Sequence, residues 1–292
     1  MLCPMSVFAT DVSGGEMCDT DVLNTDTGPV NLRAEFEPET INLKWYNGDT
    51  HLTVPNASNT CTYDDAISLP TNPTKPGYKF NGWKAIPGTR VEYLQSSGRQ
   101  YIDTGIVPSA TTNFDVGYMY IGGVGHTNAG QVILGVRNDN GGVSKGFLIS
   151  SFRYNNNNVV NADSSLNNGY VRLGDDGVGT YYLPQQNNTY VSLKSDTTGY
   201  IYFNGVKLSE TPLTRIPYGV NFSIYLFRLH HESIADYAVA RIYYLKLYND
   251  TTLVRDMVPI KDTNGVPCMY DFVSKQKFYN AGTGDFITGP DL

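Results

Sequence analysis

Charged side chains are scarce in this chain, and no segment concentrates positive charge. Charged residues make up 17% of the 292 residues, below the ~25% that is typical of globular proteins. The 21 Lys and Arg are outnumbered by 28 Asp and Glu, which gives a formal net charge of −7. Binding to duplex nucleic acid requires clustered Lys and Arg that displace counterions from the phosphates. The sequence therefore argues against nucleic acid as a partner.

Long apolar runs are missing as well. A membrane-spanning helix needs ~20 predominantly apolar residues, and the apolar run at the N-terminus is short. We expect no membrane insertion of this chain. Val7-Phe8-Ala9 fits the small-residue pattern that precedes a signal-peptidase cut. Residues 1–9 are therefore either the remnant of a secretory signal or a disordered apolar end, within a flexible leader that spans 1–29.

Cysteine is rare and scattered. The four cysteines are Cys3, Cys18, Cys61 and Cys268, and no two form a C-x-x-C pair. This spacing argues against a structural zinc site or a thioredoxin-like site. Four distant cysteines are also too few for a disulfide framework. At most one bridge is expected, and Cys18–Cys61 is the pairing that we favour.

Aromatic residues and glycine are abundant instead. The chain holds 22 Tyr, 12 Phe and 29 Gly, a composition that favours strands and tight turns over helices. Asn47-Gly48-Asp49 predicts a tight turn between two strands. In the first part of the chain, alternating apolar and polar residues predict strands at Val30–Phe36, Ile41–Tyr46, Leu52–Val54, Thr60–Tyr63, Ala66–Leu69 and Tyr78–Phe80.

Beyond Gly88 the sequence becomes a long array of short strands separated by Asn- and Gly-rich turns. This spacing predicts an all-β sandwich, and no amphipathic helix is evident. Val239–Tyr248 is the strongest strand signal of the chain. The other predicted strands are Val91–Leu94, Tyr101–Ile106, Phe114–Ile121, Gln131–Val136, Gly146–Phe152, Tyr170–Leu173, Thr180–Leu183, Tyr190–Lys194, Gly199–Phe203 and Phe222–Leu229.

The residues do not suggest catalysis. A glycoside hydrolase needs two carboxylates about 5–10 Å apart, which sandwich glucanases place two residues apart on one strand. The glutamates beyond Gly88 are Glu92, Glu210 and Glu232, and none has an acidic neighbour at i±2. Asp103 lies in a predicted strand but stands alone. The histidines are not spaced to share a metal, so zinc is not expected.

One segment resembles a known family. Tyr63, Leu69-Pro70 and PTKPGYKFNGW (Pro73–Trp83) are similar to the Listeria–Bacteroides repeat, also called the internalin B-type B repeat. The resemblance implies a small β-grasp-like extracellular module at 30–87 that acts as a spacer. Trp83 is then the main core residue of the module rather than a ligand platform.

The segment departs from the family pattern after Trp83. Repeats of this family continue into a closing strand that reads like LYAKW, whereas this chain runs directly into Ile86-Pro87-Gly88. Val30–Phe36 (VNLRAEF) has the character of the missing strand. It either ends a preceding repeat or completes this module in permuted order.

The rest of the chain resembles a second family. YLQSSGRQYIDTGI (Tyr93–Ile106), RIYYLKLY (Arg241–Tyr248) and MYDFVSKQKFYNAGTGDFITGP (Met269–Pro290) are similar to concanavalin A-like, laminin-G-like sandwich domains of surface-exposed bacterial and phage proteins. So are YIYFNG (Tyr200–Gly205) and LVRDMVP (Leu253–Pro259). The resemblance implies an antiparallel jelly roll at 90–292. It says little about the ligand, because that fold serves lectins, enzymes and structural domains alike.

Ligand residues are sought among loop aromatics and polar groups, because glycan sites combine aromatic platforms with groups that orient hydroxyls. The candidates are Tyr154, Asn155, Asn156, Tyr181, Tyr182, Arg228 and His230. Calcium is the one cofactor considered, since sandwich domains use loop oxygens to bind it. Its candidate ligands are Asp139, Asp175 and Asp176.

These patterns lead to one favoured function and two alternatives. The favoured function is a non-catalytic, secreted or surface-displayed adhesin-like protein, with the sandwich as carbohydrate-recognition head and the repeat as spacer. Its partner is then a glycan or another host or cell-surface ligand. The first alternative is a structural or protein-binding component of a surface fibre, a pilus-like assembly or a phage tail, with other surface proteins as partners. A glycoside hydrolase-like enzyme is a distant third.

Overall fold

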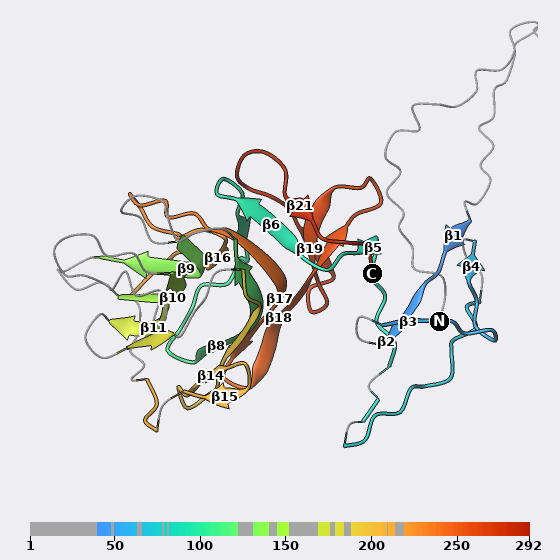
Figure 1. Cartoon of the computed structure of the whole chain (residues 1–292), viewed down its shortest axis with the longest axis horizontal. Coiled ribbons are helices and arrows are strands. Elements are labelled where there is room, and N and C mark those ends of the chain that lie inside the picture. Colours follow the sequence, from blue (N-terminus) through green and yellow to red (C-terminus); the bar gives the residue numbers. More distant parts are fainter. Residues whose placement is uncertain are drawn as a thin grey trace, which may run out of the picture. The chain divides into compact units, whose positions relative to one another are not determined.

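The computed structural model describes residues 40–47, 50–62, 66–77, 79–80, 82–121, 131–139, 145–151, 169–175, 179–183, 188–208, 210–213 and 219–292. The chain divides into two compact units, Met1–Pro87 and Gly88–Leu292 (Figure 1). The described residues are all-β, as the sequence predicts, and contain no helix. None of them therefore forms a helix that could cross a membrane. The leader and Val30–Phe36 lie outside the described residues.

The first unit contains two small antiparallel pairs. β1 (Ile41–Asn42) pairs with β4 (Thr60–Cys61), and β2 (Trp45–Asn47) pairs with β3 (Thr50–Leu52). The β2–β3 pairing brings Asn47 opposite Thr50, as the predicted hairpin requires; Gly48 and Asp49 of its turn lie outside the described residues. The single strand predicted over Ile41–Tyr46 is interrupted at Leu43 and Lys44, although the Leu43 N–H still donates to the Asn59 carbonyl at 2.7 Å, in register with the β1–β4 pair.

Proline shapes the remainder of this unit. No strand forms over Ala66–Leu69 or at the described Lys79 and Phe80, since Pro70, Pro73 and Pro76 supply no N–H to a ladder. Isolated hydrogen bonds hold the chain there instead. The Ser58 N–H donates to the Ser68 carbonyl, and the Ser68 N–H donates to Ser58 Oγ, each at 2.9 Å.

An aromatic cluster lies inside the first unit. Trp83 packs edge-on against Trp45 and Phe80, with ring centroids 5.3 Å and 5.6 Å apart. The Trp45 Nε1–H donates to the Ser58 carbonyl at 2.9 Å. These contacts agree with the interpretation of Trp83 as a core residue. Cys61 is buried and disulfide-bonded; Cys18, its expected partner, lies outside the described residues.

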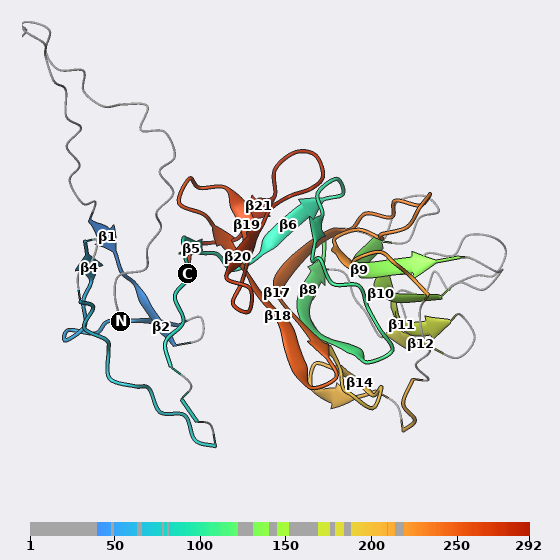
Figure 2. The same cartoon turned by 180° about the vertical axis from the view of Figure 1, so that it is seen from behind.

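The second unit is built on two antiparallel sheets that face each other (Figures 1 and 2). The larger has eleven strands, with the path β15-β14-β13-β8-β17-β18-β19-β20 and with β5, β6 and β21 attached beside β17 and β18. Its strands are β5 (Thr89–Arg90), β6 (Leu94–Ser97), β8 (Thr112–Tyr120), β13 (Val191–Ser195), β14 (Ile201–Phe203), β15 (Val206–Lys207), β17 (Val239–Asn249), β18 (Thr252–Lys261), β19 (Pro267–Asp271), β20 (Gln276–Phe278) and β21 (Ile287–Thr288).

The smaller sheet has six strands in the order β12-β11-β10-β9-β16-β7. Its strands are β7 (Ile102–Asp103), β9 (Gln131–Asn138), β10 (Lys145–Ser151), β11 (Gly169–Asp175), β12 (Thr180–Leu183) and β16 (Tyr225–Leu226). The predicted strand Thr180–Leu183 is confirmed. The predicted strand Phe222–Leu229 shortens to two residues because Phe227 adopts a φ of 66°, which is not an extended conformation.

The hydrophobic core lies between these sheets. Along β17, Ala240, Ile242, Leu245 and Leu247 are fully buried and belong to the core cluster, whereas the residues between them are partly exposed. Phe114 of the large sheet meets Phe147 of the small sheet with ring centroids 5.8 Å apart. Each sheet turns one face into this core, and part of the opposite face of the smaller sheet is covered by a second buried cluster of Val132, Leu148 and Leu229.

The segment after Val91 and the C-terminal segment close the sandwich together. β6 pairs with β21 and with β17. Beyond β6, the Ala281 N–H donates to the Tyr101 carbonyl at 2.9 Å. Gln100 is 3% exposed, accepts from the Ser97 N–H and donates to the Asp285 carbonyl. The motif Tyr93–Ile106 therefore joins the start of this unit to its end.

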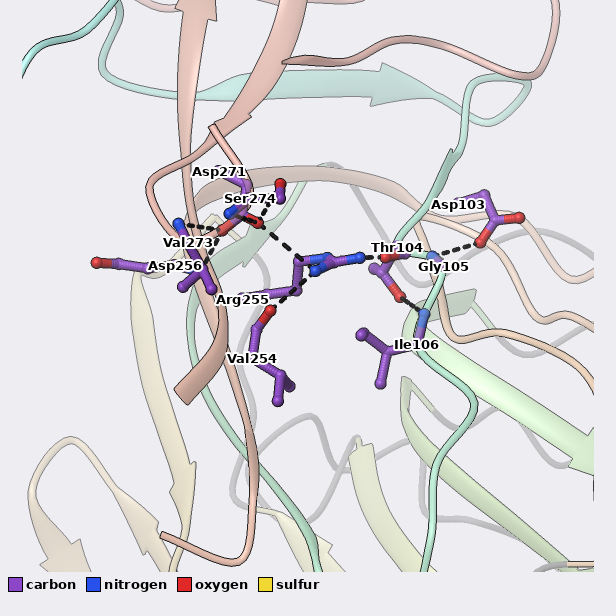
Figure 3. Close-up of polar contacts among 10 residues, drawn as sticks. All are labelled: Asp103, Thr104, Gly105, Ile106, Val254, Arg255, Asp256, Asp271, Val273 and Ser274. Atoms are coloured by element: carbon purple, nitrogen blue, oxygen red, sulfur yellow. Dashed lines mark hydrogen bonds and ion pairs between the residues drawn. The ribbon is translucent and has the colours of Figure 1, made fainter. Parts of the chain in front are cut away.

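An ion pair within the larger sheet is tied to the segment that follows β7 of the smaller sheet (Figure 3). Arg255 on β18 donates through Nε to the Thr104 carbonyl, beyond β7, at 2.9 Å. One of its Nη atoms lies 3.6 Å from Asp271 Oδ2. Asp271 has no exposed surface and also accepts bonds from the backbone N–H groups of Asp256, Val273 and Ser274 and from the Ser274 hydroxyl. The carboxylate is fully occupied by donors, which marks it as structural.

Candidate functional site

The candidate site lies on the outer face of the six-stranded sheet, at its β16–β7 edge. Leu226 and Ile102 are buried in the core, so the alternation of strands turns Tyr225 and Asp103 outward. These two residues are direct partners in the β16–β7 register. We call the side chains gathered around Tyr225 the Arg228 cluster: Tyr101, Phe222, Tyr225, Arg228, His230 and Tyr237.

Four aromatic rings of the Arg228 cluster form a row. The Tyr225 and His230 rings are stacked with centroids 3.7 Å apart and an interplanar angle of 14°. Tyr101 stacks on Tyr225 at 4.7 Å. Phe222 follows on the side of His230 at 5.0 Å. All four side chains are partly exposed, and Phe222 also packs against the core, so the row reaches the surface from the edge of the core.

Arg228 lies among tyrosine rings. Its guanidinium carbon is 4.8 Å from the Tyr101 ring centroid, 5.1 Å from that of Tyr237 and 5.8 Å from that of Tyr225. Cation–π attraction holds the guanidinium in this position. No ion pair to Arg228 occurs among the described residues, and its buried Nε–H lacks an acceptor there. Within the described part of the chain, the cluster thus contains a positive charge that is not paired with a carboxylate.

The backbone next to Arg228 is strained. A φ of 66° is unusual for a bulky residue such as Phe227 and costs of order 1–3 kcal/mol. Phe227 is held in this conformation because its N–H donates to the Ile133 carbonyl and its carbonyl accepts from the Ala238 N–H. Its ring is fully buried. The surrounding fold therefore fixes the direction in which Arg228 leaves the chain.

The polar groups of the Arg228 cluster have defined protonation. Burial raises the pKa of Tyr225, and the nearby Asp103 carboxylate raises it further, so its phenol stays protonated at neutral pH. His230 Nδ1 lies 2.8 Å from the Ser223 carbonyl. Because a carbonyl only accepts hydrogen bonds, this nitrogen carries a hydrogen. A ligand at the cluster would meet phenol hydroxyls and guanidinium donors.

A second polar group lies beside the Arg228 cluster. Asp139 Oδ2 accepts from Arg137 at 2.9 Å and lies 3.0 Å from His231 Nε2. His231 Nδ1 accepts from the Ser233 and Ile234 N–H groups, so the Nε2 hydrogen is the one shared with Asp139. Burial raises the pKa of the nearby Asp236, although its electrostatic interactions with Arg137 and His231 act to lower that pKa.

Asp139 was one of three predicted calcium ligands. The described residues contain no group of three His, Cys, Asp or Glu that could hold a metal. One oxygen of Asp139 is engaged by Arg137 and His231. Asp175 ends β11, but its side chain and all of Asp176 lie outside the described part of the structure. Calcium therefore stays a prediction.

The other predicted ligand residues are distributed as follows. Arg228 and His230 come together in the Arg228 cluster. Tyr181 lies on β12, at the opposite edge of the sheet, where its hydroxyl donates to the Leu208 carbonyl and its ring packs against the core. Tyr154, Asn155, Asn156 and the side chain of Tyr182 lie outside the described residues.

The sequence interpretation did not select Tyr101, Tyr225 or Tyr237. For the first two a signal was present, because each lies next to an inward-facing aliphatic residue, Ile102 and Leu226. Alternation therefore predicts that both tyrosines face outward. Their proximity was not predictable, since the β7–β16 pairing joins segments that are far apart in the chain. No comparable signal marks Tyr237.

No catalytic arrangement emerges from the described residues. The buried carboxylate of Asp262, like that of Asp271, is occupied by hydrogen-bond donors, the Asn264 and Val266 N–H groups and the Tyr279 hydroxyl. The segment Gly142–Gly146 has the spacing G-x-S-x-G, but a nucleophile elbow requires a strand-to-helix turn. Here the segment leads into strand β10 instead.

Comparison with known proteins adds two similarities. No curated protein matches the chain. One solved structure that is similar is the 1.50 Å crystal structure of a "putative carbohydrate binding protein" from Bacteroides ovatus ATCC 8483. The two share 11% sequence identity and a TM-score of 0.36. The alignment covers 70% of this chain and 61% of that chain.

The second similarity is to a family model. The matched range, residues 45–101, extends beyond the first unit, because Gly88 onward belongs to the second unit. Within that extension, β5 and β6 pair with β18, β17 and β21 of the second unit. They therefore do not supply the closing strand of the repeat. Residues 45–101 thus match the Listeria-Bacteroides repeat domain.

Proposed function

We propose that this protein is a non-catalytic, surface-displayed carbohydrate-binding protein that binds a glycan at the Arg228 cluster. The observation that carries the proposal is the guanidinium of Arg228, which lies among three tyrosine rings and forms no ion pair with a carboxylate of the described residues. Sugar sites combine aromatic surface with a few oriented polar groups. Arginine donates to hydroxyls and, in a bidentate manner, to the carboxylate of an acidic sugar.

The repeat supports the surface location in this proposal. Residues 45–101 match a repeat domain of Listeria and Bacteroides type, and the resemblance noted above implies an extracellular spacer. The first unit then carries the second unit, which acts as an adhesin-like head. The glycan belongs to a host or to another cell surface.

An assembly role is the second candidate, and the exposed sheet edge carries it. β15 ends the large sheet, and its Val206 is 65% exposed. An open edge can pair with a strand of another protein. However, β15 is only two residues long and also carries Lys207, features that discourage edge pairing. The Arg228 cluster therefore supports carbohydrate binding better than this edge supports assembly.

A glycan array with the full chain tests the proposal. We expect saturable binding to a class of glycans and roughly tenfold or greater weakening by Arg228→Gln, because a hydrogen bond to a charged group contributes about 1.5–3 kcal/mol. Arg172→Gln is the matched control, since Arg172 also lies over a tyrosine ring, that of Tyr170, at 5.2 Å. The control should bind like the unmodified protein.

Two further arms make the array decisive. Arg228→Lys keeps the charge but loses the planar donor pair, so an acidic sugar should still bind, but more weakly. A parallel array with chelator tests the calcium proposal for Asp139, Asp175 and Asp176: loss of binding supports it, and unchanged binding refutes it. Equal binding by the Arg228→Gln and Arg172→Gln proteins would remove the Arg228 cluster as the site.

A further inference from the structure

A second group of tyrosines lies on the outer face of the large sheet. β17 contains a bulge between Ile242 and Tyr244 in its pairing with β8. A bulge inserts one extra residue and redirects the neighbouring side chains. Tyr243 and Tyr244 are both partly exposed as a result, whereas Ile242 and Leu245 on either side are buried in the core.

The rings around this bulge contact one another. Tyr243 packs edge-on against Tyr93 at 5.6 Å and against Tyr190 at 5.0 Å. The guanidinium carbon of Arg241 lies 4.1 Å from the Tyr93 ring centroid. We call Tyr93, Tyr190, Arg241, Tyr243 and Tyr244 the Tyr243 cluster. It repeats the combination of the Arg228 cluster, an arginine on tyrosine rings, with different residues.

Polar groups border the Tyr243 cluster. The Arg241 Nε–H donates to Gln95 Oε1 at 2.8 Å, and no carboxylate pairs with Arg241 among the described residues. The Tyr244 hydroxyl donates to Asp115 at 2.9 Å and lies 3.1 Å from the Ser192 hydroxyl. Burial raises the pKa of both Tyr243 and Tyr244, so their hydroxyls remain neutral donors and acceptors.

A glycine on β8 makes room for two of these rings. A Cβ atom at Gly117 would lie 2.6 Å from the Tyr244 ring and 2.9 Å from the Tyr190 hydroxyl. The missing side chain leaves room for the Tyr244 ring and the Tyr190 hydroxyl beside the strand. Tyr190 itself is 42% exposed, so the cluster presents aromatic surface to solvent.

We propose that the Tyr243 cluster is a second saccharide-binding site, which makes the head bivalent. Exposed aromatic surface, an arginine without a carboxylate and neutral hydroxyls are the groups that bind a sugar ring.

The two sites point away from each other. The Arg228 cluster lies on the outer face of the six-stranded sheet, and the Tyr243 cluster lies on the outer face of the opposite sheet. The inner faces of both sheets form the core between them, and packed sheets are about 10 Å apart. One sugar residue cannot reach both sites. Two glycan chains can be held by one head, which raises avidity on a surface rich in glycan.

The number of oligosaccharides bound per chain tests the inference. We would titrate the full chain with fluorescently labelled oligosaccharides from yeast mannan and, separately, from pectin, and measure stoichiometry by equilibrium dialysis. We expect two bound molecules per chain with at least one probe. Tyr190→Ala should reduce the value to one, and so should Arg241→Gln. The double variant Tyr190→Ala/Arg228→Gln should bind none.

A matched control separates site loss from general damage. Tyr279 is 44% exposed, close to the value for Tyr190, and it belongs to neither cluster, so Tyr279→Ala should still bind two molecules. Unmodified protein that binds at most one molecule of either probe overturns the inference. So does a value of two for Tyr190→Ala and Arg241→Gln. Loss of one molecule in these variants supports the second site whatever Arg228→Gln does, so failure of the first site is recognised separately.

Discussion

At the scale of single residues, some buried polar groups of this protein have their hydrogen bonds made, whereas Trp83 Nε1, Arg137 Nε and Arg228 Nε have no acceptor among the described residues. Asp271 and Arg255 illustrate the first case, since the carboxylate receives donors from three backbone N–H groups, one hydroxyl and the guanidinium. Arg228 illustrates the second case, because its buried Nε–H has no acceptor among the described residues.

Asp271→Asn should strongly destabilise the second unit. The amide removes the charge that faces Arg255 and turns N–H groups toward backbone N–H groups. Breaking a buried pair by removal of one charge costs about 3–5 kcal/mol, which lowers the melting temperature by roughly 10 °C for a domain of this size. Thermal unfolding measured by circular dichroism checks this. Asp250→Asn, the same change at an exposed residue, is the control, and equal melting temperatures for the two variants would contradict the structural role.

At the scale of elements, the closure of the sandwich depends on a close backbone approach. A Cβ atom at Gly282 would lie 2.1 Å from the Arg99 carbonyl oxygen, an atom that belongs to the backbone and cannot rotate away. The adjacent Thr283 N–H donates to the same oxygen. Only glycine fits where the C-terminal segment crosses the Ser97–Gln100 turn.

Gly282→Ala should therefore loosen this closure. Forced overpacking costs about 1–3 kcal/mol, and the damage should be local first. Hydrogen exchange at the Thr283 and Ala281 amides should accelerate in this variant, because the added methyl group would strain their hydrogen bonds to the Arg99 and Tyr101 carbonyls. Ala281→Ser, at the exposed neighbouring residue, should leave exchange unchanged. Slow exchange retained in Gly282→Ala would show that the chain accommodates the methyl group by a shift.

The strands also show what sequence can predict. Thr180–Leu183 and all of Val239–Tyr248 form strands where alternation predicted them, because one face of each is buried in the core. Phe222–Leu229 has the same alternation but is cut short by the positive φ of Phe227, which contacts with Ile133 and Ala238 impose. Such a conformation is set by distant partners, so local pattern does not reveal it.

The candidate sites were predictable only in part for the same reason. Arg228 and His230 were selected as polar residues beside a strand, and both join the Arg228 cluster. Their tyrosine neighbours come from other segments, which the β7–β16 pairing brings together. The residues of the Tyr243 cluster depend on a bulge whose position is visible only in the register of β17 against β8. Composition predicted a tyrosine-rich surface, whereas register decides which tyrosines meet.

At the scale of the whole molecule, acid stability should follow three carboxyl groups. Burial by itself would raise the pKa of Asp196, Asp262 and Asp271, but hydrogen bonds to their carboxylates outweigh it and lower each pKa below its ordinary value. A carboxyl whose folded pKa is lowered stabilises the fold above its unfolded pKa, which is about 3.9 for Asp. That contribution is lost as the pH falls through the folded pKa.

The free energy of unfolding should therefore be constant with respect to these groups at pH 5–7 and decrease below about pH 4. Urea unfolding at a series of pH values measures this decrease in the free energy of unfolding. In Asp271→Asn the free energy of unfolding should decrease less steeply with falling pH, because one of the three groups no longer takes up a proton on unfolding. Asp250→Asn should keep the full slope. A slope in Asp271→Asn equal to that of the unmodified protein would mean that the Asp271 pKa is not lowered by its hydrogen bonds, and that the acid response of the molecule arises elsewhere.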